Sequence, residues 1–441
     1  MDFAKRAYDH SFRLDPIVRS LLDTDFYKLL MGQFIFENYP KTQVTFGLIN
    51  RTRTVRLAEI IPEAELRAQL DHVRTLRFRP NELIWIAGAT FYGQERMFRP
   101  AFIEFLRTLS MPDYALRIED GQYVLTFSGS WAEVTWWEIY ALAIVSELKS
   151  RAGHRRRSEL ELDFLYAWAK SKLLAKLQPL KALESLALSD FGTRRRHSFL
   201  WQEWTVRAMA DVLGPRFVGT SNAFLAFKHG LDAKGTNAHE LPMVLAALAR
   251  DDTELRASQY ELLRRWQEAY SSNLLVALPD TFGTTQFLRD APDWLAADWR
   301  GYRPDSKPPF EAGEEIIDWL LREGVDPTSR FLLFSDGLDV AVPGHTPHGE
   351  DITSIHRRFA GRVGLAYGWG TNATNDFRGC DPLGETLFDP LSLVCKVVAA
   401  DGRPAVKLSD NFNKATGPAG EIERYRRVFG LEGVGGAPVE V

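Results

Sequence analysis

The sequence lacks the features that define several large classes of protein. Only two cysteines, Cys380 and Cys395, occur in 441 residues, too few for a disulfide framework or a four-thiolate zinc site. No apolar run approaches membrane-spanning length, and residues 1–6 lack the apolar core of a signal peptide. Neither sign of charge dominates, because the formal net charge is −4, which leaves no electrostatic footprint for nucleic acid. We therefore expect a cytoplasmic protein that binds neither nucleic acid nor membranes.

Two common nucleotide-binding signatures are also missing. The chain has no Gly-x-x-x-x-Gly-Lys loop and no complete Gly-x-Gly-x-x-Gly fingerprint, which disfavours P-loop nucleotidases and dinucleotide-dependent dehydrogenases. The sequence does have length and apolar content. Its 441 residues suffice for two or three domains, and 45% hydrophobic with 25% charged residues is typical of globular proteins.

The first 150 residues mix strands and helices, and a basic, glycine-containing break follows them at 151–157. The elements predicted around this break are strands at 42–49 and 123–127, a buried helix at 133–148, and a helix over 158–183 that Pro179 should kink or end. We place a domain boundary at the break, so that residues 1–150 form an N-terminal α+β domain.

Beyond the break, short apolar runs alternate with helical stretches. The predicted strands are 274–278, 331–334 and 362–367, and the predicted helices are 199–213, 239–250, 254–269 and 312–323. This alternation predicts βα units around a mainly parallel sheet or barrel over residues 151–400. Segments 391–398 and 405–408 predict a hairpin across Asp401 and Gly402, and we expect 400–441 to join the N-terminal domain.

Residues 235–240, which read Gly-Thr-Asn-Ala-His-Glu, place His239 in the first turn of a predicted helix. Asn237 has the character of an N-cap, and Glu240 three residues later completes a capping-box spacing. A histidine beside free N–H groups and the positive end of the helix dipole is poorly placed to hold a proton and well placed to carry a phosphate. For this motif alone, a histidine that merely lies at a helix start is the simpler interpretation.

Polar clusters follow directly after several predicted strands. In an extended segment Arg194 and Arg196 would share a face and Arg195 would take the other, so one face could grip a carboxylate or phosphate beside Phe191. An isolated arginine triplet would otherwise be a solvated basic loop. Thr220 and Ser221 supply two hydroxyls after another strand, which suits a small polar ligand or simply a helix start.

Carboxylates end three further strands, at Asp280, at Asp305 (with Arg303 and Ser306), and at Asp336. Such groups can bind ribose hydroxyls, hold Mg²⁺ or stabilise a cationic sugar carbon. One aspartate after a strand is usually a turn or cap residue, but three in one predicted barrel indicate a site.

The loop that follows the strand at 362–367 is rich in glycine and hydroxyl groups. Its residues Gly368, Gly370, Thr371 and Asn372 offer backbone N–H groups and hydroxyls to a phosphate, late in the barrel where phosphate sites recur.

Taken in order, these clusters resemble the bacterial nicotinate phosphoribosyltransferases. The matching stretches are 21–28, 131–148, 190–196, 219–222, 235–240, 280–284, 303–306, 335–339, 370–376 and 406–410. The resemblance spans nearly the whole chain, and ten ordered motifs are far more specific than any one of them.

The resemblance implies a reaction in NAD biosynthesis. Nicotinate and 5-phosphoribosyl 1-pyrophosphate would give nicotinate mononucleotide and pyrophosphate with Mg²⁺, coupled to ATP hydrolysis, which is ligase-type chemistry. It also implies the type II phosphoribosyltransferase fold, an irregular seven-stranded α/β barrel beside the N-terminal α+β domain, in a homodimer with shared sites.

The resemblance also implies roles for single residues. His239 would carry the phosphate from ATP, and Phe191 would sandwich the pyridine ring with Tyr27 of the other subunit, beside Arg194. The phosphoribosyl group would be contacted by Arg303, Asp305, Ser306 and Asp336, and its 5-phosphate would be bound by Gly368, Gly370, Thr371 and Asn372. The substrate would also be bound by Thr220 and Ser221. The resemblance leaves the metal ligands open.

Ser221 bears on substrate choice. The related nicotinamide enzymes carry an aspartate there, which would accept the amide and repel the carboxylate of nicotinate, so Ser221 favours the acid. The alternatives are a nicotinamide phosphoribosyltransferase, a phosphosugar-binding barrel lyase and an inactive homologue. The inactive homologue is supported by Lys307-Pro308-Pro309, where the family continues Gly-Asp-Pro. His345 and His348 could bind a metal, although a flexible surface loop fits that segment better.

Overall fold

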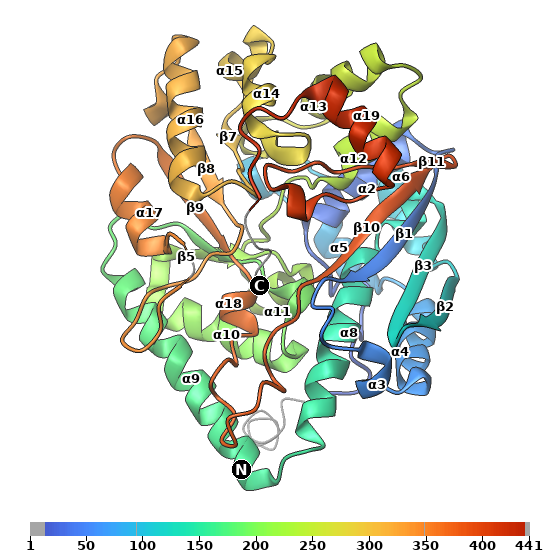
Figure 1. The fold of residues 1–441 in the computed structure, drawn as a ribbon, viewed down its shortest axis with the longest axis vertical. Helices are drawn as coiled ribbons and strands as arrows, with labels where there is room; N and C mark the ends of the chain where they lie inside the picture. Colours follow the sequence, from blue (N-terminus) through green and yellow to red (C-terminus); the bar gives the residue numbers. More distant parts are fainter. Residues whose placement is uncertain (1–13, 94, 348, 437–441) are drawn as a thin grey trace.

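The computed structural model describes residues 14–93, 95–347 and 349–436, and they form two sheets with surrounding helices (Figure 1). The helices are α2 (Tyr27–Asn38), α3 (Leu57–Ile60), α4 (Glu63–Thr75), α5 (Pro80–Ala87), α6 (Pro100–Thr108), α7 (Trp131–Val134), α8 (Trp137–His154), α9 (Glu159–Lys181), α10 (Phe199–Leu213), α11 (Ala223–His229), α12 (Glu240–Leu248), α13 (Asp252–Ala269), α14 (Thr284–Arg289), α15 (Asp293–Asp298), α16 (Pro309–Arg322), α17 (Ile352–Phe359), α18 (Thr371–Thr374) and α19 (Ala419–Phe429).

The first sheet is antiparallel and joins distant parts of the chain. Its strand order is β11-β10-β1-β3-β2, with β1 at Gln43–Asn50, β2 at Tyr114–Glu119, β3 at Gln122–Ser130, β10 at Leu393–Ala400 and β11 at Arg403–Pro404. The predicted hairpin is confirmed, because Asp401 and Gly402 have φ of 46° and 75°, as a two-residue turn between twisted strands requires. Strand β10 thus places C-terminal side chains beside the N-terminal ones of β1.

The second sheet is parallel, with the order β5-β4-β9-β8-β7-β6. Its strands are β4 (Leu188–Asp190), β5 (Phe217–Thr220), β6 (Val276–Ala277), β7 (Gly301–Tyr302), β8 (Phe331–Phe334) and β9 (Gly364–Trp369). Helices follow most of these strands in the sequence and cover the sheet from outside (Figure 1), which confirms the predicted βα organisation and the mixed α/β class.

Closure of a seven-stranded barrel stays a prediction. In the described residues six strands are paired, and the edge strands β5 and β6 do not pair with each other. The segment 232–237 lies between them: Ala233 forms a single parallel bridge with Thr220, and the Asn237 side-chain amide donates to the Val276 carbonyl over 3.0 Å. An irregular connection therefore spans the place where a seventh strand would lie.

Two helices are buried on nearly every side and explain why their sequences show no amphipathic stripe. Residues 27–35 of α2 are all buried, and α8 is buried over almost its whole length. Pro179 does not end α9, which continues to Lys181 and finishes close to the predicted limit.

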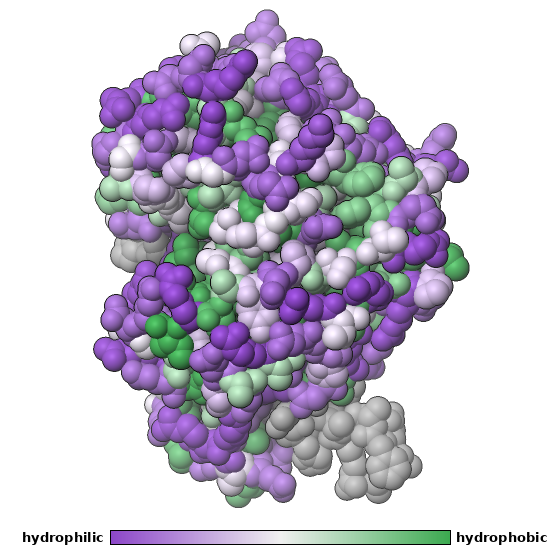
Figure 2. Space-filling view, turned by 90° about the vertical axis from the view of Figure 1, so that its right-hand side faces the viewer, coloured by the Kyte–Doolittle hydropathy of each residue, from purple (hydrophilic) through white to green (hydrophobic). Residues whose placement is uncertain are grey.

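The surface beside the antiparallel sheet is mixed, with hydrophilic side chains predominating and apolar ones between them (Figure 2). Within the described ranges, no helix combines the length and the apolar character needed to cross a lipid bilayer.

Lys307, which departs from the family motif, is a packing residue. Its ammonium lies 2.6 Å from the Glu315 carboxylate on α16 and 3.0 Å from the Thr285 hydroxyl on α14, and its side chain is only 3% exposed. The lysine therefore ties two outer helices together.

We expect Lys307→Met to lower the free energy of unfolding by about 1–3 kcal/mol, because it leaves Glu315 without its close cation. Urea unfolding measures this change. Arg107→Met, which removes the exposed pair with Glu104, is the control and should have little effect. Equal stability of the Lys307 variant and the parent would show that the pair contributes nothing.

Candidate active site

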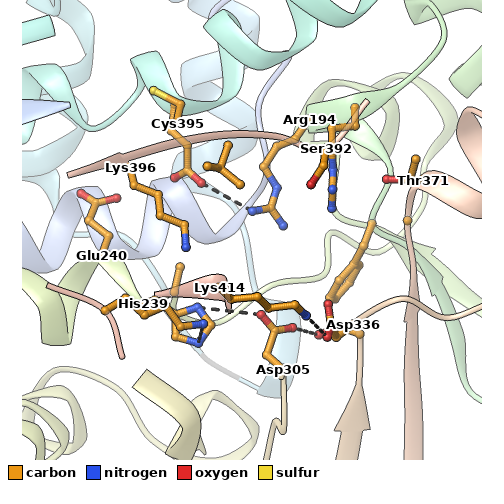
Figure 3. Close-up of a pocket in the computed structure, with 18 of the residues that line it drawn as sticks. Arg194, His239, Glu240, Asp305, Asp336, Thr371, Ser392, Cys395, Lys396 and Lys414 are labelled. Atoms are coloured by element: carbon orange, nitrogen blue, oxygen red, sulfur yellow. Dashed lines mark hydrogen bonds and ion pairs between the residues drawn. The ribbon is translucent and has the colours of Figure 1, made fainter. Parts of the chain in front are cut away.

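A cavity of about 190 Å³ opens between strand β10 and the carboxyl ends of the parallel strands (Figure 3). The predicted site residues that line it are Tyr27, Phe191, Arg194, His239, Arg303, Asp305, Asp336, Gly370, Thr371 and Asn372. Tyr27 begins α2, His239 precedes α12 and the others follow strand ends, so the structure brings clusters that are far apart in the sequence together in one place.

Four predicted site residues do not line the cavity. They contact residues that line it, or the sequence neighbours of such residues. Three of them are hydroxyls that donate to buried carboxylates: Thr220 to Asp190 over 2.7 Å, Ser221 to Asp25 over 2.7 Å, and Ser306 to Asp280 over 2.8 Å. The fourth, Gly368, gives room to a ring, because a Cβ there would lie 2.2 Å from Phe191.

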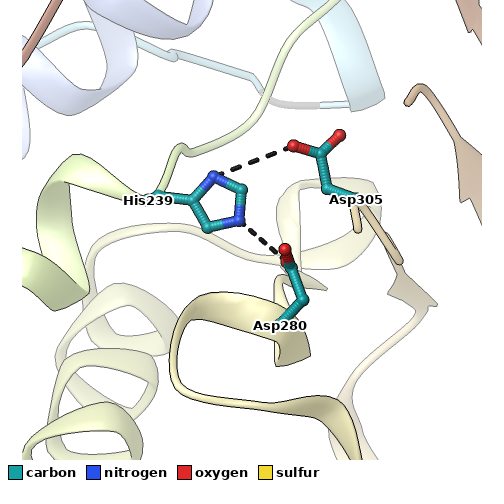
Figure 4. Close-up of side chains that lie close together, drawn as sticks. All are labelled: His239, Asp280 and Asp305. Atoms are coloured by element: carbon teal, nitrogen blue, oxygen red, sulfur yellow. Dashed lines mark hydrogen bonds and ion pairs between the residues drawn. The ribbon is translucent and has the colours of Figure 1, made fainter. Parts of the chain in front are cut away.

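His239 occupies the N-cap position of α12, and its two ring nitrogens face different carboxylates (Figure 4). Nε2 lies 2.8 Å from Asp280, and Nδ1 lies 3.8 Å from Asp305 on the cavity side. Burial, aided by the charge of Lys407, lowers the pKa of His239 although Asp280 opposes this. The shorter contact, to Asp280, favours a neutral imidazole whose Nε2–H donates to that carboxylate, although the Lys407 ammonium lies 3.2 Å from the same nitrogen, and whose Nδ1 faces the cavity.

The predicted capping of this helix is wrong. The Asn237 side chain reaches the Val276 carbonyl, and Glu240 accepts from buried donors elsewhere, so neither residue forms a capping box. Both side chains form hydrogen bonds with groups from other parts of the chain and not with the backbone at the helix start.

Asp280 is the fixed anion behind His239. Burial opposes its charge, but the hydrogen bond from His239, the charge of Lys407 and the Ser306 hydroxyl hold the pKa of this carboxyl well below its usual range. Both of its oxygens are engaged, because Lys407 lies 3.1 Å from the oxygen that Ser306 also contacts. Asp280 is therefore suited to orienting the imidazole and not to binding a ligand.

Arg194 marks one end of the cavity. Its guanidinium lies 3.4 Å from Asp25 and 3.5 Å from Glu138, and 5.9 Å from the Tyr27 ring centroid. Tyr27 lines the cavity of its own chain. A contribution of Tyr27 from the other subunit, which the resemblance implied, stays a prediction. The single chain thus assembles an aromatic and cationic pocket.

The predicted faces of the arginine triplet are wrong. Residues 193–195 form a 3-10 turn, so Arg194 and Arg195 both line the cavity. Arg196 turns away and forms a buried, two-pronged ion pair with Asp23, with both N–O distances 2.7 Å.

The cavity also holds cations that the sequence analysis did not single out. Arg51, Lys396 and Lys414 line it together with Arg195, and Lys396 extends from β10 toward the space between Arg194 and His239 (Figure 3). Burial and then the charge of Arg194 lower the pKa of Arg195 to about 10, and burial with the charges of Lys407 and Arg51 brings that of Lys396 well below its usual value.

Neither Arg195 nor Lys396 has a carboxylate within ion-pair distance in the part of the chain that the structure describes. Neighbouring cations without counter-ions favour a ligand with several negative charges. The sequence held one signal, since Lys396 interrupts an otherwise apolar strand.

Asp305 and Asp336 face these cations. The Ser335 hydroxyl donates to Asp305 over 2.7 Å, and Lys414 pairs with Asp336 at 2.5 Å. Burial opposes the charge of Asp305, but the charge of Arg303 holds its pKa below the usual range. One oxygen of Asp305 stays open to the cavity, a geometry that can stabilise positive charge or join a cation's ligands.

A second cluster, Asp339, His345 and Asp376, also converges, but Lys176 lies 2.5 Å and 2.6 Å from its two carboxylates. A lysine already supplies the positive charge there, which argues against a metal. His348, the other histidine of this loop, lies outside the described residues.

Comparison with known proteins agrees with this geometry. Residues 186–432 match the nicotinate phosphoribosyltransferase (NAPRTase) family model, and residues 22–146 match the model of its N-terminal domain. A nicotinate phosphoribosyltransferase from Vibrio cholerae is 30% identical with a TM-score of 0.81, the match covering 96% of this chain and 96% of that chain.

Two further solved structures are similar over nearly their whole length. A nicotinate phosphoribosyltransferase from Porphyromonas gingivalis is 26% identical with a TM-score of 0.80, the match covering 94% of this chain and 100% of that one. A putative nicotinate phosphoribosyltransferase from Saccharomyces cerevisiae is 26% identical with a TM-score of 0.80, the match covering 95% of this chain and 99% of that one. With both family models matched in order and the strand-end site in place, the chain belongs to the nicotinate phosphoribosyltransferase family.

Proposed function

We propose that the protein transfers the phosphoribosyl group of 5-phosphoribosyl 1-pyrophosphate to nicotinate, releasing pyrophosphate, and that ATP hydrolysis through His239 drives the reaction. One observation carries the proposal: a single cavity is lined by the aromatic residues Tyr27 and Phe191 with Arg194, by the unpaired cations Arg195 and Lys396, and by strand-end carboxylates. This lining fits a pyridine carboxylate together with a sugar that bears phosphates.

The chemistry requires no general base. The lone pair of the pyridine nitrogen forms the new bond to C1 of the ribose, while the C1–O bond breaks and its electrons leave with pyrophosphate. Asp305 and Asp336 are placed to stabilise the positive charge that develops on the sugar. Arg51, Arg195 and Lys396, with the backbone at Gly370 and Thr371, would hold the phosphates.

Magnesium fits this donor set. Mg²⁺ prefers carboxylate and phosphate oxygens, and Asp305 offers an oxygen that no hydrogen bond occupies, with Asp336 close by. Bound with the pyrophosphate group, the ion would neutralise charge on the leaving group. Asp280 also converges with His239 and Asp305, but both of its oxygens already accept hydrogen bonds, so Asp305 is the better placed ligand.

The acid is favoured over the amide because Arg194 presents a cation to the ring pocket. Ser221 acts indirectly, by donating to Asp25 beside that arginine. The lyase alternative needs an amine in the cavity, and Lys396 supplies one. Family membership and the ring pocket favour phosphoribosyl transfer. A homodimer remains part of the proposal, although the described cavity is built within one chain.

We expect purified protein to form nicotinate mononucleotide, faster with ATP present, and His239→Asn to lose the ATP stimulation and all labelling by [γ-³²P]ATP. His229→Asn, which alters a histidine bound to Glu203 on α10, is the matched control and should keep both. Full ATP stimulation in the His239 variant would contradict the phosphohistidine, and product from nicotinamide alone would contradict the substrate.

The pH dependence of labelling tests the charge state of His239. Because its pKa is lowered, the imidazole stays neutral and nucleophilic until the pH falls below the ordinary value of 6.5. Lys407→Met removes a charge that lowers this pKa, so we expect the acid limb of the labelling rate to move to higher pH. Lys407→Arg should leave it in place, and the comparison cancels the titration of ATP itself. An unshifted limb would show that Lys407 does not control His239.

Gly368→Ala tests the ring pocket, since its Cβ would collide with Phe191. We expect the KM for nicotinate to rise about tenfold or more, with a smaller effect on the KM for the phosphoribosyl donor. Gly361→Ala, in an exposed turn, is the control for a general effect on folding. A larger effect on the donor would return Gly368 to the phosphate-binding role that the sequence predicted.

A further inference from the structure

A buried lysine lies behind the ring pocket and does not itself line the cavity. Lys28 on α2 is 0% exposed, and its ammonium lies 2.7 Å from Glu138 and 2.5 Å from Glu240. Both carboxylates line the cavity. Lys28 therefore bridges two acids of the site from the protein side.

The two acids differ in how far they depend on this lysine. Glu240 has other donors, because Trp131 Nε1 and the Thr135 hydroxyl each lie 2.6 Å from its second oxygen. Apart from Lys28, Glu138 has among the described residues only the Tyr27 hydroxyl at 3.2 Å and the long contact of 3.5 Å with Arg194. Removal of Lys28 would thus leave Glu138 as the poorly satisfied charge.

The charges around Glu138 make Lys28 its main partner. The titratable groups that face it are Asp25, Tyr27 and Lys28 from the α2 region, Arg194 from the 3-10 turn, Glu240 from α12, and Cys395 and Lys396 from β10. Burial opposes ionisation of Glu138, and among the charges that lower its pKa that of Lys28 comes first, ahead of Arg194. The two carboxylates in turn raise the pKa of Lys28 against its burial, so it stays charged.

Arg194 is consequently only loosely held. Both of its ion-pair distances, 3.4 Å to Asp25 and 3.5 Å to Glu138, exceed those of a close charge-assisted hydrogen bond, and its side chain is 39% exposed. A guanidinium left in this condition can turn its free donors toward a ligand carboxylate.

We propose that Lys28 is a positioning residue that sets the affinity for nicotinate: by holding Glu138 from behind, it keeps that acid from capturing Arg194, the cation that receives the substrate carboxylate. The inference rests on the proposed function for the identity of the ligand. Without Lys28, an ionised Glu138 closes onto Arg194 and competes with the ligand. When Glu138 is protonated, the competition ends.

The test measures binding of radiolabelled nicotinate by equilibrium dialysis at pH 6 and pH 8, together with the KM values for both substrates. We expect Lys28→Met to weaken nicotinate binding at least about tenfold at pH 8, to recover much of it at pH 6, and to change the KM of the phosphoribosyl donor less than about twofold. The sign follows because Glu138, having lost its main cation, takes up a proton as the pH falls.

Rescue separates this role from a structural one. Lys28→Met with Glu138→Gln should bind nicotinate within about threefold of the parent at both pH values, since the competing charge is gone. The nicotinate affinity of Lys28→Arg should lie between those of the parent and Lys28→Met. Arg157→Met, which removes a cation that is 3% exposed and paired with Asp381 far from the cavity, is the control for loss of a buried charge and should not change nicotinate affinity.

Each outcome decides one of the two proposals or both. Equal binding by parent and Lys28→Met, or no rescue by Glu138→Gln, overturns the role of Lys28 and leaves the enzyme function intact. Binding that follows the expected pattern without any product overturns the proposed reaction and supports the role of Lys28. No binding of nicotinate by the parent at either pH overturns both. If Lys28→Met does not fold, Glu138→Gln alone decides, because it should bind nicotinate at least as tightly as the parent.

Discussion

The site depends on the pairing of β1 with β10. This antiparallel ladder joins Val44–Asn50 to a strand almost 350 residues later, and it places the C-terminal segment against the carboxyl ends of the parallel strands. Lys396 lies on β10 itself, and Lys407 and Lys414 follow the hairpin that β10 begins. Without this pairing the cavity would keep its carboxylates and lose three of its cations.

Charge is distributed in the site in two ways. Cations that are buried outside the cavity form ion pairs with carboxylates, as Lys28 does with Glu138 and Glu240, and Arg196 with Asp23. Arg195 and Lys396 line the cavity without a close carboxylate in the described residues, and their pKa values are lowered by burial and by neighbouring cations, among them Arg51. Burying cations without counter-ions lowers the stability of the unliganded protein. A bound polyanion would supply the missing negative charge, so ligand binding should stabilise the fold.

Local sequence patterns predicted the strands β1, β3, β6, β8, β9 and β10 and the helices α8, α9, α10, α12, α13 and α16, because burial repeats along the chain. They did not predict strand β2 or the helices α2, α4, α5 and α6. They also located Asp305, Asp336 and His239, since the ends of parallel strands meet at one edge. They did not predict the cations from β10, because which strand lies beside β1 depends on pairing between distant segments. The arginine triplet was misjudged for a local reason: a 3-10 turn changes which neighbouring side chains share a face. The capping of α12 failed because buried partners competed for Asn237 and Glu240.

Thr220, Ser221 and Ser306 show why a motif can mark a site without touching its ligand. Each hydroxyl donates to a buried carboxylate, yet the carboxylates differ. Asp190 accepts hydrogen bonds from uncharged donors, and Asp25 has a hydroxyl donor and the more distant Arg194. Burial therefore raises the pKa of Asp190 to about 6 and also raises that of Asp25. Asp280, with His239 and Lys407 beside it, stays ionised. A hydroxyl donor orients the carboxylate, and a close cation keeps it ionised. Of the three carboxylates only Asp280 has both a hydroxyl and a close cation, so it can hold the imidazole in one tautomer.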